Sequence, residues 1–583
     1  MLNPRLKKLL TYLRPHWQRV TLGMVALFIV NVIGVFIPLF IRDAIDNLQD
    51  ALNFSNILRF VFLIFIFASL MWSFRMASRI TMFGVGRQVE VDLKQRIFQH
   101  LLTLQPAYFA VNSIGDLMNR STSDVDNIRR LLGFAVLSLV NTLFAYCFTL
   151  PVMLGIHIKL TLCALAIYPL MLIAVQLFSD KLRVEQRDVQ ENLSDLSQLI
   201  QEDMSGIALI KIYAQELNEI IAFKGKNRSL LEANLKLART RNLLFPIIEG
   251  LVYISLLILL WLGTAAIEVG EISIGDFVAL ILFVERLVFP TALLGFTITA
   301  YQRGEVSIDR VESILMASPS IQDEEGAIVL PPELVQGKIS VQNLNFTYQG
   351  TDRRVLKDIN FIIEPGETIA IVGPIGSGKS TLANALPRLL DIAPEQVFLD
   401  GYDITKLRLK DLREAIAYVP QDSFLFSTVI KNNIRYGQPL AEQFEIEDAA
   451  KQAQIHPEIL NFPRQYDTLV GERGITLSGG QRQRASLARA LIVDAPVLIL
   501  DDALSSVDNQ TATEILGLLS TSEVGDRTVI FISHQLSAAA TANRIFVMNE
   551  GEIVQMGTHA ELINKPGLYK HLWKQQQLEK AVL

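Results

Sequence analysis

The sequence predicts a multidomain chain, in which an all-α membrane domain of six helices is followed by an α/β domain that binds phosphate. The first observation is size, because 583 residues are too many for one hydrophobic core. The second is that half of all residues are hydrophobic and that these are concentrated in residues 20–300. The third is the segment GPIGSGKST at 373–381, which follows an apolar strand and is typical of a phosphate-binding loop.

Six apolar segments are each near the length of about 20 residues that a helix needs to cross hydrocarbon. An even number of crossings places both chain ends on one side. Five basic residues precede the first segment, whereas the loop at 42–56 has one arginine and three aspartates, so we expect both termini to be cytoplasmic. The expected spans are residues 20–41, 57–81, 132–154, 160–178, 244–267 and 274–298.

The regions flanking the spans also carry information. Residues 5–17 have apolar side chains at helical spacing and predict an interfacial helix rather than a cleaved signal peptide. The inner segments 82–131 and 179–243 are charged and poor in proline and glycine, so the helices should continue into the cytoplasm. We expect them to turn back within 108–126, around Gly115, and within 210–223.

Composition changes again after the last span. Residues 318–337 contain proline, glycine and acidic side chains and predict a linker. The chain then divides into a membrane domain at 1–317, this linker, and a nucleotide-binding domain at 338–583. The net charge of −6 is small for this length and gives no support to nucleic-acid binding.

The phosphate loop predicts an ATP site that uses Mg²⁺. Its glycines allow backbone N–H groups to turn toward phosphate oxygens, and the following helix adds a partial positive charge. Lys379 should reach the outer phosphates, and the Ser380 hydroxyl should bind Mg²⁺. Asp501, at the end of the apolar strand VLIL, is the second expected Mg²⁺ ligand. The expected nucleotide contacts in the loop are Gly373, Pro374, Ile375, Gly376, Ser377, Gly378, Lys379, Ser380 and Thr381.

The string LSGGQ at 477–481 has no role in an isolated phosphate-loop ATPase. Together with the phosphate loop and VLILDD, it resembles the nucleotide-binding domain of ABC transporters, in which LSGGQ is the signature. In that family two such domains pair head to tail, with each ATP between the phosphate loop of one and the signature of the other. The resemblance makes Ser478, Gly479, Gly480 and Gln481 nucleotide contacts of a partner's site, and a helix N-terminus there would suit the γ-phosphate.

The same resemblance assigns further residues. Tyr348 matches the aromatic residue that stacks on adenine, and Gln421 matches the glutamine that contacts Mg²⁺ and senses the membrane domain. Asp508 matches the loop that crosses between paired sites, and His534 matches the switch histidine at the γ-phosphate. TLVGERG at 468–474 matches an exporter-specific loop.

The whole chain resembles a half-transporter of the multidrug-exporter and lipid-flippase type. This implies ATP-driven movement of amphiphilic drugs or lipids across a bacterial inner membrane, with a second half-transporter as partner. Two other classes are an ATP-gated channel or sensor and a soluble ABC ATPase acting on nucleic acid, and the spans argue against the latter.

Asp502 departs from the family pattern, which usually has glutamate after the strand aspartate to activate the attacking water. General-base assistance is worth about 10²–10⁴ in rate, and the shorter side chain retracts the carboxylate. The sequence here resembles the slow-site subunit of heterodimeric exporters. A heterodimer is therefore the favoured reading, and a homodimer in which aspartate suffices is the alternative. The expected catalytic residues are Asp502, His534 and Gln421.

Charged residues within the spans are costly and normally face protein or water. Glu285 and Arg286 lie in the sixth expected span, and Arg75 and Arg79 lie toward the inner end of the second. If the three arginines share a cavity, anionic amphiphiles such as lipids would be favoured substrates.

Overall fold

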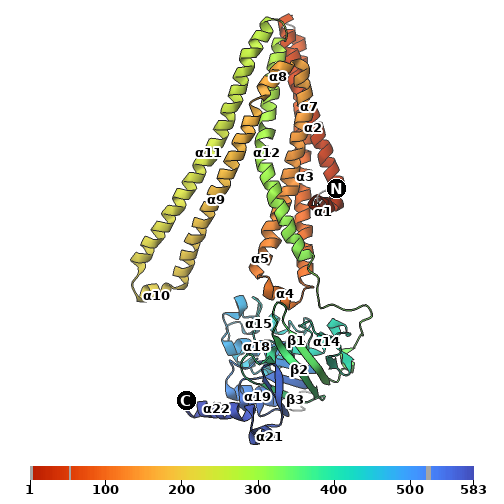
Figure 1. The fold of residues 1–583 in the computed structure, drawn as a ribbon, viewed down its shortest axis with the longest axis vertical. Helices are drawn as coiled ribbons and strands as arrows, with labels where there is room; N and C mark the ends of the chain where they lie inside the picture. Colours follow the sequence, from red (N-terminus) through yellow and green to blue (C-terminus); the bar gives the residue numbers. More distant parts are fainter. Residues whose placement is uncertain (1–3, 51–53, 520–526, 583) are drawn as a thin grey trace. The chain divides into compact units, whose positions relative to one another are not determined.

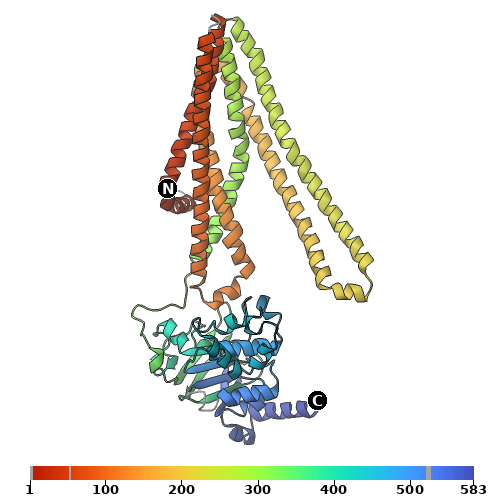
Figure 2. The same cartoon turned by 180° about the vertical axis from the view of Figure 1, so that it is seen from behind.

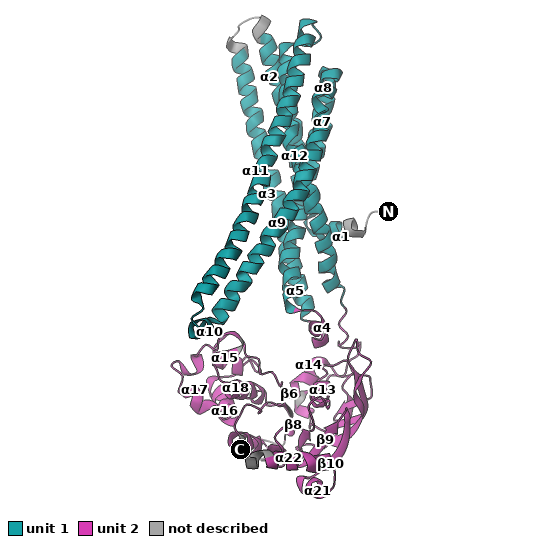
Figure 3. Cartoon of the chain, turned by 60° about the vertical axis from the view of Figure 1, so that its left-hand side comes forward, with its two compact units in different colours: residues 1–102, 114–317 teal, residues 103–113, 318–583 magenta. Residues whose placement is uncertain are grey.

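The computed structural model describes residues 4–50, 54–519 and 527–582 (Figure 1). The chain forms two compact units (Figure 3). Residues up to 102 and residues 114–317 form the first, which is helical, and residues 103–113 and 318 onward form the second, which contains the sheets. The predicted order of an all-α membrane domain and an α/β domain is confirmed.

Six helical segments of the described chain are long and apolar enough to cross a membrane, which confirms the predicted number. They extend beyond the apolar stretches, because their charged inner parts also favour helix. Helices α9 and α11 lie side by side as a long hairpin in both views (Figures 1 and 2). The helices of this unit are α1 (Pro4–Leu13), α2 (Trp17–Asp50), α3 (Phe54–Leu101), α5 (Ile114–Asn119), α6 (Val125–Arg130), α7 (Val136–Ile156), α8 (Ile158–Leu165), α9 (Tyr168–Ser205), α10 (Ile207–Ile212), α11 (Glu216–Glu268) and α12 (Ile274–Leu315).

The turns at the inner ends differ from the predicted positions. The first break lies at 102–113 and contains the short helix α4 (Pro106–Val111), whereas Gly115 lies inside α5. Pro106 explains this, because the residue before a proline is driven to extended geometry, and Gln105 has φ −73° and ψ 157°. The second break lies at 206–215, earlier than most of the expected 210–223.

The third span is interrupted by two π turns, at Arg120–Asp124 and Leu131–Ala135. Near the second of them α12 approaches closely, since a Cβ on Gly304 would lie 2.7 Å from the Cβ of Leu131. Small residues at such crossings allow membrane helices to pack backbone to backbone.

The second unit contains a six-stranded sheet in the order β10-β9-β3-β8-β7-β6, in which only β10 is antiparallel to its neighbour. A four-stranded antiparallel sheet has the order β2-β1-β4-β5. The strands are β1 (Ile339–Thr347), β2 (Arg354–Ile363), β3 (Thr368–Val372), β4 (Val397–Leu399), β5 (Tyr402–Asp403), β6 (Ile416–Val419), β7 (Val497–Asp501), β8 (Thr528–Ile532), β9 (Arg544–Asn549) and β10 (Glu552–Gly557).

The strands β3, β7 and β8 are buried at every residue, which explains their continuous apolar sequences. Because they are parallel, their carboxyl ends meet at one edge of the sheet, where ligands of such folds bind. The helices of this unit beside α4 are α13 (Lys379–Ala385), α14 (Leu409–Glu414), α15 (Ile430–Ile434), α16 (Gln443–Gln452), α17 (His456–Leu460), α18 (Gly479–Leu491), α19 (Asn509–Leu519), α20 (Leu536–Ala539), α21 (His559–Asn564) and α22 (Leu568–Val582).

Part of the segment expected as a linker is bound to the second unit. The Ile328 N–H donates to the carbonyl of Lys406 at 2.8 Å, and the Arg408 N–H donates to the carbonyl of Ile328 at 3.0 Å. The Leu330 N–H donates to the carboxylate of Asp411 at 3.0 Å. These bonds fix residues 328–330 against α14, so the free connection is shorter than the composition predicted.

Candidate ATP site

The phosphate loop connects the buried strand β3 to α13. Gly373 and Gly378 have φ values of +152° and +99°, which strongly favour glycine. A Cβ on Gly373 would also lie 2.1 Å from the carbonyl oxygen of Met548. The loop therefore depends on glycine for its conformation and for its approach to β9. Pro374, Ile375, Gly376 and Ser377 complete the turn, in which Ile375 is exposed and Ser377 is buried.

The side chain of Lys379 lies inside the loop. Its ammonium donates to the carbonyl oxygens of Gly373 and Pro374, both at 2.9 Å. Burial lowers the pKa of Lys379, and the neighbouring carboxylates of Asp502 and Asp501 oppose that shift. The loop thus holds a cation within a ring of backbone groups, which suits a nucleotide phosphate.

Ser380 and Asp501 meet at the carboxyl edge of the sheet, as the sequence predicted for two Mg²⁺ ligands. The Ser380 hydroxyl donates to Oδ1 of Asp501 at 2.8 Å. Burial raises the pKa of Asp501, while hydrogen bonds from Ser380 and Tyr418 oppose the rise. A hydroxyl and a carboxylate are hard oxygen ligands of the kind that Mg²⁺ takes alongside phosphates. Among the residues with described positions, no cluster of three acidic, histidine or cysteine side chains offers a complete protein cage for a metal.

Tyr418 is a site residue that the sequence analysis missed. Its hydroxyl lies 3.2 Å from Oδ2 of Asp501 and 2.9 Å from Oδ1 of Asn384. It comes from β6, which pairs with β7 so that Tyr418 lies opposite Ile499. Its position three residues before Gln421 was an available signal, but only the strand pairing shows what it touches.

Asp502 follows the end of β7 in a left-handed conformation with φ +49°. Its N–H donates to the carbonyl of Ile532 at 3.2 Å, and its own carbonyl accepts the N–H of Ser505 at 3.3 Å. The residue is buried, and burial raises its pKa while the nearby imidazole of His534 opposes the rise. The backbone that aims this carboxylate is therefore fixed on both sides.

The other residues expected around the nucleotide lie at the rim. Tyr348 follows β1 and is 38% exposed, with its hydroxyl 3.1 Å from that of Thr381. Gln421 follows β6 and His534 follows β8, and both side chains are exposed. The structure thus links Tyr348 to the phosphate loop, and the exposed side chains of Gln421 and His534 are open to a ligand.

The signature segment forms the N-terminus of α18. The Ser478 hydroxyl accepts the N–H of Gln481 at 3.2 Å, and the Ser478 N–H donates to Oε1 of Gln481 at 2.9 Å. The amide of Gln481 then donates to Glu458 at 2.8 Å. A Cβ on Gly480 would lie 2.9 Å from the carbonyl oxygen of Ser506. No hydrogen bond among the described residues joins these four signature residues to the phosphate loop.

Two further contacts stabilise the loops near the site. The carboxylate of Asp508 accepts the N–H of Thr511 at 2.9 Å, which lowers the pKa of Asp508 and starts α19. The amide of Gln576, from the C-terminal helix α22, accepts the N–H of Leu536 at 2.8 Å and donates to the carbonyl of His534 at 3.2 Å. Gln576 belongs to no motif, so sequence reasoning could not single it out.

Comparison with known proteins agrees with this geometry. Residues 20–291 match the family described as the ABC transporter transmembrane region, and residues 356–505 match the family described as ABC transporter. The chain is 33% identical over 576 residues to a probable multidrug resistance ABC transporter ATP-binding/permease protein, YheI, of Bacillus subtilis, covering 98% of each chain. It is also 33% identical to the multidrug resistance-like ATP-binding protein MdlA of Escherichia coli, covering 98% of this chain and 96% of that one.

A solved structure gives the same result. A bacterial Atm1-family ABC exporter with ATP bound superposes with a TM-score of 0.77 at 25% identity, covering 96% of this chain and 99% of the other. Both the membrane helices and the α/β domain therefore have counterparts in one known architecture.

Proposed function

Because the chain belongs to the ABC exporters, multi-pass bacterial membrane proteins that act as dimers and couple ATP hydrolysis to export, we propose that it is the slow-site half of a heterodimer. Its own phosphate loop forms the weak site, and its signature segment completes the site of a second half-transporter. The exported substrates are amphiphiles such as drugs or lipids. A homodimer is the alternative.

The observation that supports the slow site is the fixed position of Asp502. Its backbone is tied to Ile532 and Ser505, so the chain cannot easily move the carboxylate forward. Compared with glutamate, the carboxylate is retracted by about one C–C bond, roughly 1.5 Å. A general base must lie within hydrogen-bond reach of the water it activates, and a displacement of this size is enough to lose that reach.

The signature segment supports the second part of the proposal. Ser478 and Gln481 hold the N-terminus of α18 in a capping box, and Gly480 allows it to pack on Ser506. This end of the helix is intact, so it can supply N–H groups to the γ-phosphate on a partner. Tyr348 would stack on adenine, and His534 would contact the γ-phosphate of the chain's own site.

The donor set at the sheet edge fits Mg²⁺, with Ser380 and Asp501 as the residues that would hold it. The ion would neutralise charge on the phosphates when bound. Lys379 binds and orients the outer phosphates, Gln421 extends from β6 beside them, and Tyr418 holds the Asp501 carboxylate in place.

We further propose a membrane topology and a route by which ATP binding moves the helices. Both termini lie in the cytoplasm, with a membrane domain at 1–317, a connection at 318–337 and the nucleotide-binding domain at 338–583. Helix α4 belongs to the same compact unit as the nucleotide-binding domain, and the side chain of Gln105 just before it accepts the N–H of Ser320 at 3.3 Å. Movement of that domain on ATP binding would thus be passed to the helices through residues 103–113.

The test compares ATP hydrolysis by the purified chain with that of its Asp502→Glu and Asp502→Asn variants in lipid nanodiscs. The proposal expects slow turnover of the unmodified chain and a rise of about tenfold or more on Asp502→Glu, because the longer side chain restores the reach of the base. Asp502→Asn should leave the slow rate almost unchanged.

Fast turnover of the unmodified chain that Asp502→Asn abolishes would instead establish a competent homodimer. Tagged chain recovered from its own cells provides the second arm, because the heterodimer requires a different half-transporter in stoichiometric amount. ATP-dependent uptake of substrate into inverted vesicles separates export from a channel or sensor.

A further inference from the structure

A cavity of about 710 Å³ lies within the membrane unit, between α9, α12 and the junction of α6 with its π turn. It is lined by polar, cationic and aromatic side chains and by no acidic residue. The lining residues are Asn127, Arg130, Phe134, Ser179, Leu182, Arg183, Gln186, Phe296, Thr299, Ala300 and Arg303.

Two glycines of α12, Gly295 and Gly304, approach neighbouring helices closely on either side of the cavity. A Cβ on Gly295 would lie 2.5 Å from Cγ1 of Val175 on α9, and one on Gly304 would lie 2.7 Å from Leu131. Between these two positions, four residues of α12 line the cavity: Phe296, Thr299, Ala300 and Arg303. Thr297, on another face, is buried and donates to the Ser138 hydroxyl at 2.8 Å. One face of α12 therefore borders the cavity, while another face packs against α7.

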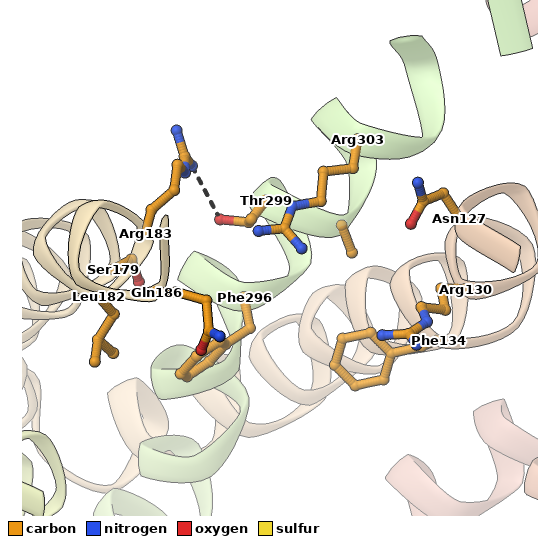
Figure 4. Close-up of a pocket in the computed structure, with 11 residues that line it drawn as sticks. Asn127, Arg130, Phe134, Ser179, Leu182, Arg183, Gln186, Phe296, Thr299 and Arg303 are labelled. Atoms are coloured by element: carbon orange, nitrogen blue, oxygen red, sulfur yellow. Dashed lines mark hydrogen bonds between the residues drawn. The ribbon is translucent and has the colours of Figure 1, made fainter. Parts of the chain in front are cut away.

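The arginines of the cavity differ in their partners. Arg130 is paired with Asp126 at 2.7 Å. Arg183 has only a long hydrogen bond of 3.5 Å to the Thr299 hydroxyl and lies 3.9 Å from Asp180. Arg303 has no ion-pair or hydrogen-bond partner among the described residues. Figure 4 shows its side chain between α9 and the helix that carries Arg130 and Phe134.

A neighbouring cavity contains a carboxylate, but that carboxylate is not free to pair with Arg303. A second cavity of about 340 Å³ shares Arg183 and Arg303 with the first and includes Asp124. That carboxylate is already paired with Arg310 at 3.1 Å and accepts a hydrogen bond from Ser307 at 2.7 Å. Among the described residues, Arg303 therefore faces the space without an anionic partner, and Arg183 has only the 3.9 Å pair with the exposed carboxylate of Asp180.

The position of these cations along the helices adds a second argument. Arg130 precedes the apolar stretch 132–154, and Arg183 and Arg303 follow the stretches 160–178 and 274–298. On the expected spans, all three lie just beyond the hydrocarbon, at the level of lipid headgroups, while Phe134 and Phe296 line the cavity beside them. The arginines expected from the sequence, Arg75, Arg79 and Arg286, do not line this cavity.

We propose that this cavity binds the anionic headgroup of an amphiphile, with Arg183 and Arg303 as its charge partners and Phe134 and Phe296 against its apolar part. The headgroup is a phosphate, sulfonate or carboxylate, because a guanidinium binds such groups through two parallel hydrogen bonds. The π turn at Leu131–Ala135 places Phe134 on the cavity wall, and π turns are frequent at functional sites. This inference rests on the proposed export of amphiphiles and specifies their class.

The experiment measures binding to the full chain in nucleotide-free nanodiscs, so it does not depend on ATP turnover. The probes are radiolabelled oleoyl lysophosphatidic acid and oleoyl lysophosphatidylcholine, which share an acyl chain and differ in headgroup charge. The aromatic sulfonate 8-anilinonaphthalene-1-sulfonate competes as a non-lipid anion. If the sulfonate displaces the phosphate lipid, the site binds anionic amphiphiles in general. If the phosphate lipid binds tightly and the sulfonate does not displace it, the site is specific for lipids.

Arg303→Ala and Arg183→Ala should each weaken binding of the phosphate lipid by about tenfold or more, since a charge-assisted hydrogen bond is lost. Arg303→Lys should restore only part of the affinity, because it keeps the charge and loses the two parallel hydrogen bonds. The matched control is Arg187→Ala, because Arg187 lies one turn further along α9, pairs with Glu191 at 2.8 Å and does not line the cavity.

Equal affinity for the two lipids in the unmodified chain would overturn the inference, as would unchanged phosphate-lipid binding in the Arg183/Arg303 double variant. If a variant fails to fold, the comparison of the two lipids on the unmodified chain still decides. If the unmodified chain hydrolyses ATP slowly but does not prefer the phosphate lipid, only this inference is refuted. If it prefers the phosphate lipid but hydrolyses ATP fast, only the slow site is refuted.

Discussion

The side-chain amide of Gln576 lies 3.2 Å from the carbonyl oxygen of His534, so the C-terminal helix α22 is bonded to the loop that carries this proposed switch histidine. The same amide accepts the N–H of Leu536 at 2.8 Å. One side chain thus fixes both ends of the turn between β8 and α20.

Replacing Gln576 with alanine should loosen this turn without unfolding the domain. Each lost hydrogen bond is worth about 0.5–1.5 kcal/mol, so amide exchange at Leu536 should become about 2- to 10-fold faster. Hydrogen exchange of peptides covering 533–540 measures this. Gln577→Ala is the control, because Gln577 is exposed and forms no side-chain hydrogen bond or ion pair with the described residues. Equal exchange in both variants would contradict the assigned role.

Tyr418→Phe removes the hydroxyl that lies 3.2 Å from Asp501 and leaves the ring in place. The carboxylate then loses a donor in a buried setting, which should disturb its orientation toward Mg²⁺. We expect the Mg²⁺ concentration for half-maximal ATP binding to rise by about 3- to 10-fold, from the energy of one such bond. A titration with a fluorescent ATP analogue checks this, with Tyr402→Phe as control because Tyr402 is exposed. An unchanged Mg²⁺ titration would refute it.

These two residues show where sequence reasoning reached its limit. The meeting of Ser380 with Asp501 could be predicted, because each ends or follows a buried parallel strand and such ends share one edge. Tyr418 required knowledge that β6 lies beside β7, and Gln576 required the path of a helix 42 residues beyond His534. The contacts of Tyr418 and Gln576 depend on which elements pack together in the tertiary structure, and no local sequence pattern encodes that packing.

The membrane helices show the same limit for a different reason. Their number and type follow from apolar length alone. Which arginines face a cavity depends on helix rotation and on where glycines allow close approach, so the sequence left Arg286 open between helix packing and a cavity and did not single out Arg303. The inner turn was expected within 108–126, around Gly115, whereas the break lies at 102–113, because proline constrains the residue before it and a glycine does not by itself end a helix.

Gly34→Ala tests the actual surroundings of Arg286. A Cβ at this position would lie 2.2 Å from a guanidinium nitrogen of Arg286, whose other nitrogen donates to the carbonyl of Asn31 at 3.0 Å. The variant must therefore displace a charged group inside the helix bundle. We expect destabilisation of about 1–3 kcal/mol, seen as a lower midpoint of thermal unfolding in detergent. Gly84→Ala has open space at its Cβ and should leave the midpoint unchanged. Equal midpoints in the two variants would show that Arg286 moves without cost.

Asp46 joins the end of α2 to the start of α12. Its carboxylate accepts the Ser273 hydroxyl at 2.7 Å and the Gly275 N–H at 2.8 Å, and Ser273 is itself the N-cap of α12. Asp46→Ala leaves the Gly275 donor without its partner, so we expect a loss of about 1–3 kcal/mol of stability. Asp46→Asn keeps one acceptor oxygen, so its stability should lie between that of the unmodified chain and that of Asp46→Ala. The control is Asp43→Ala, since the ion pair of Asp43 with Arg42 at 2.9 Å is partly exposed and worth about 0–1 kcal/mol. Thermal unfolding of the three variants in one detergent decides. If Asp43→Ala were as costly as Asp46→Ala, the carboxylate would act only through local charge, and the hydrogen bonds to α12 would not be what holds the two helices together.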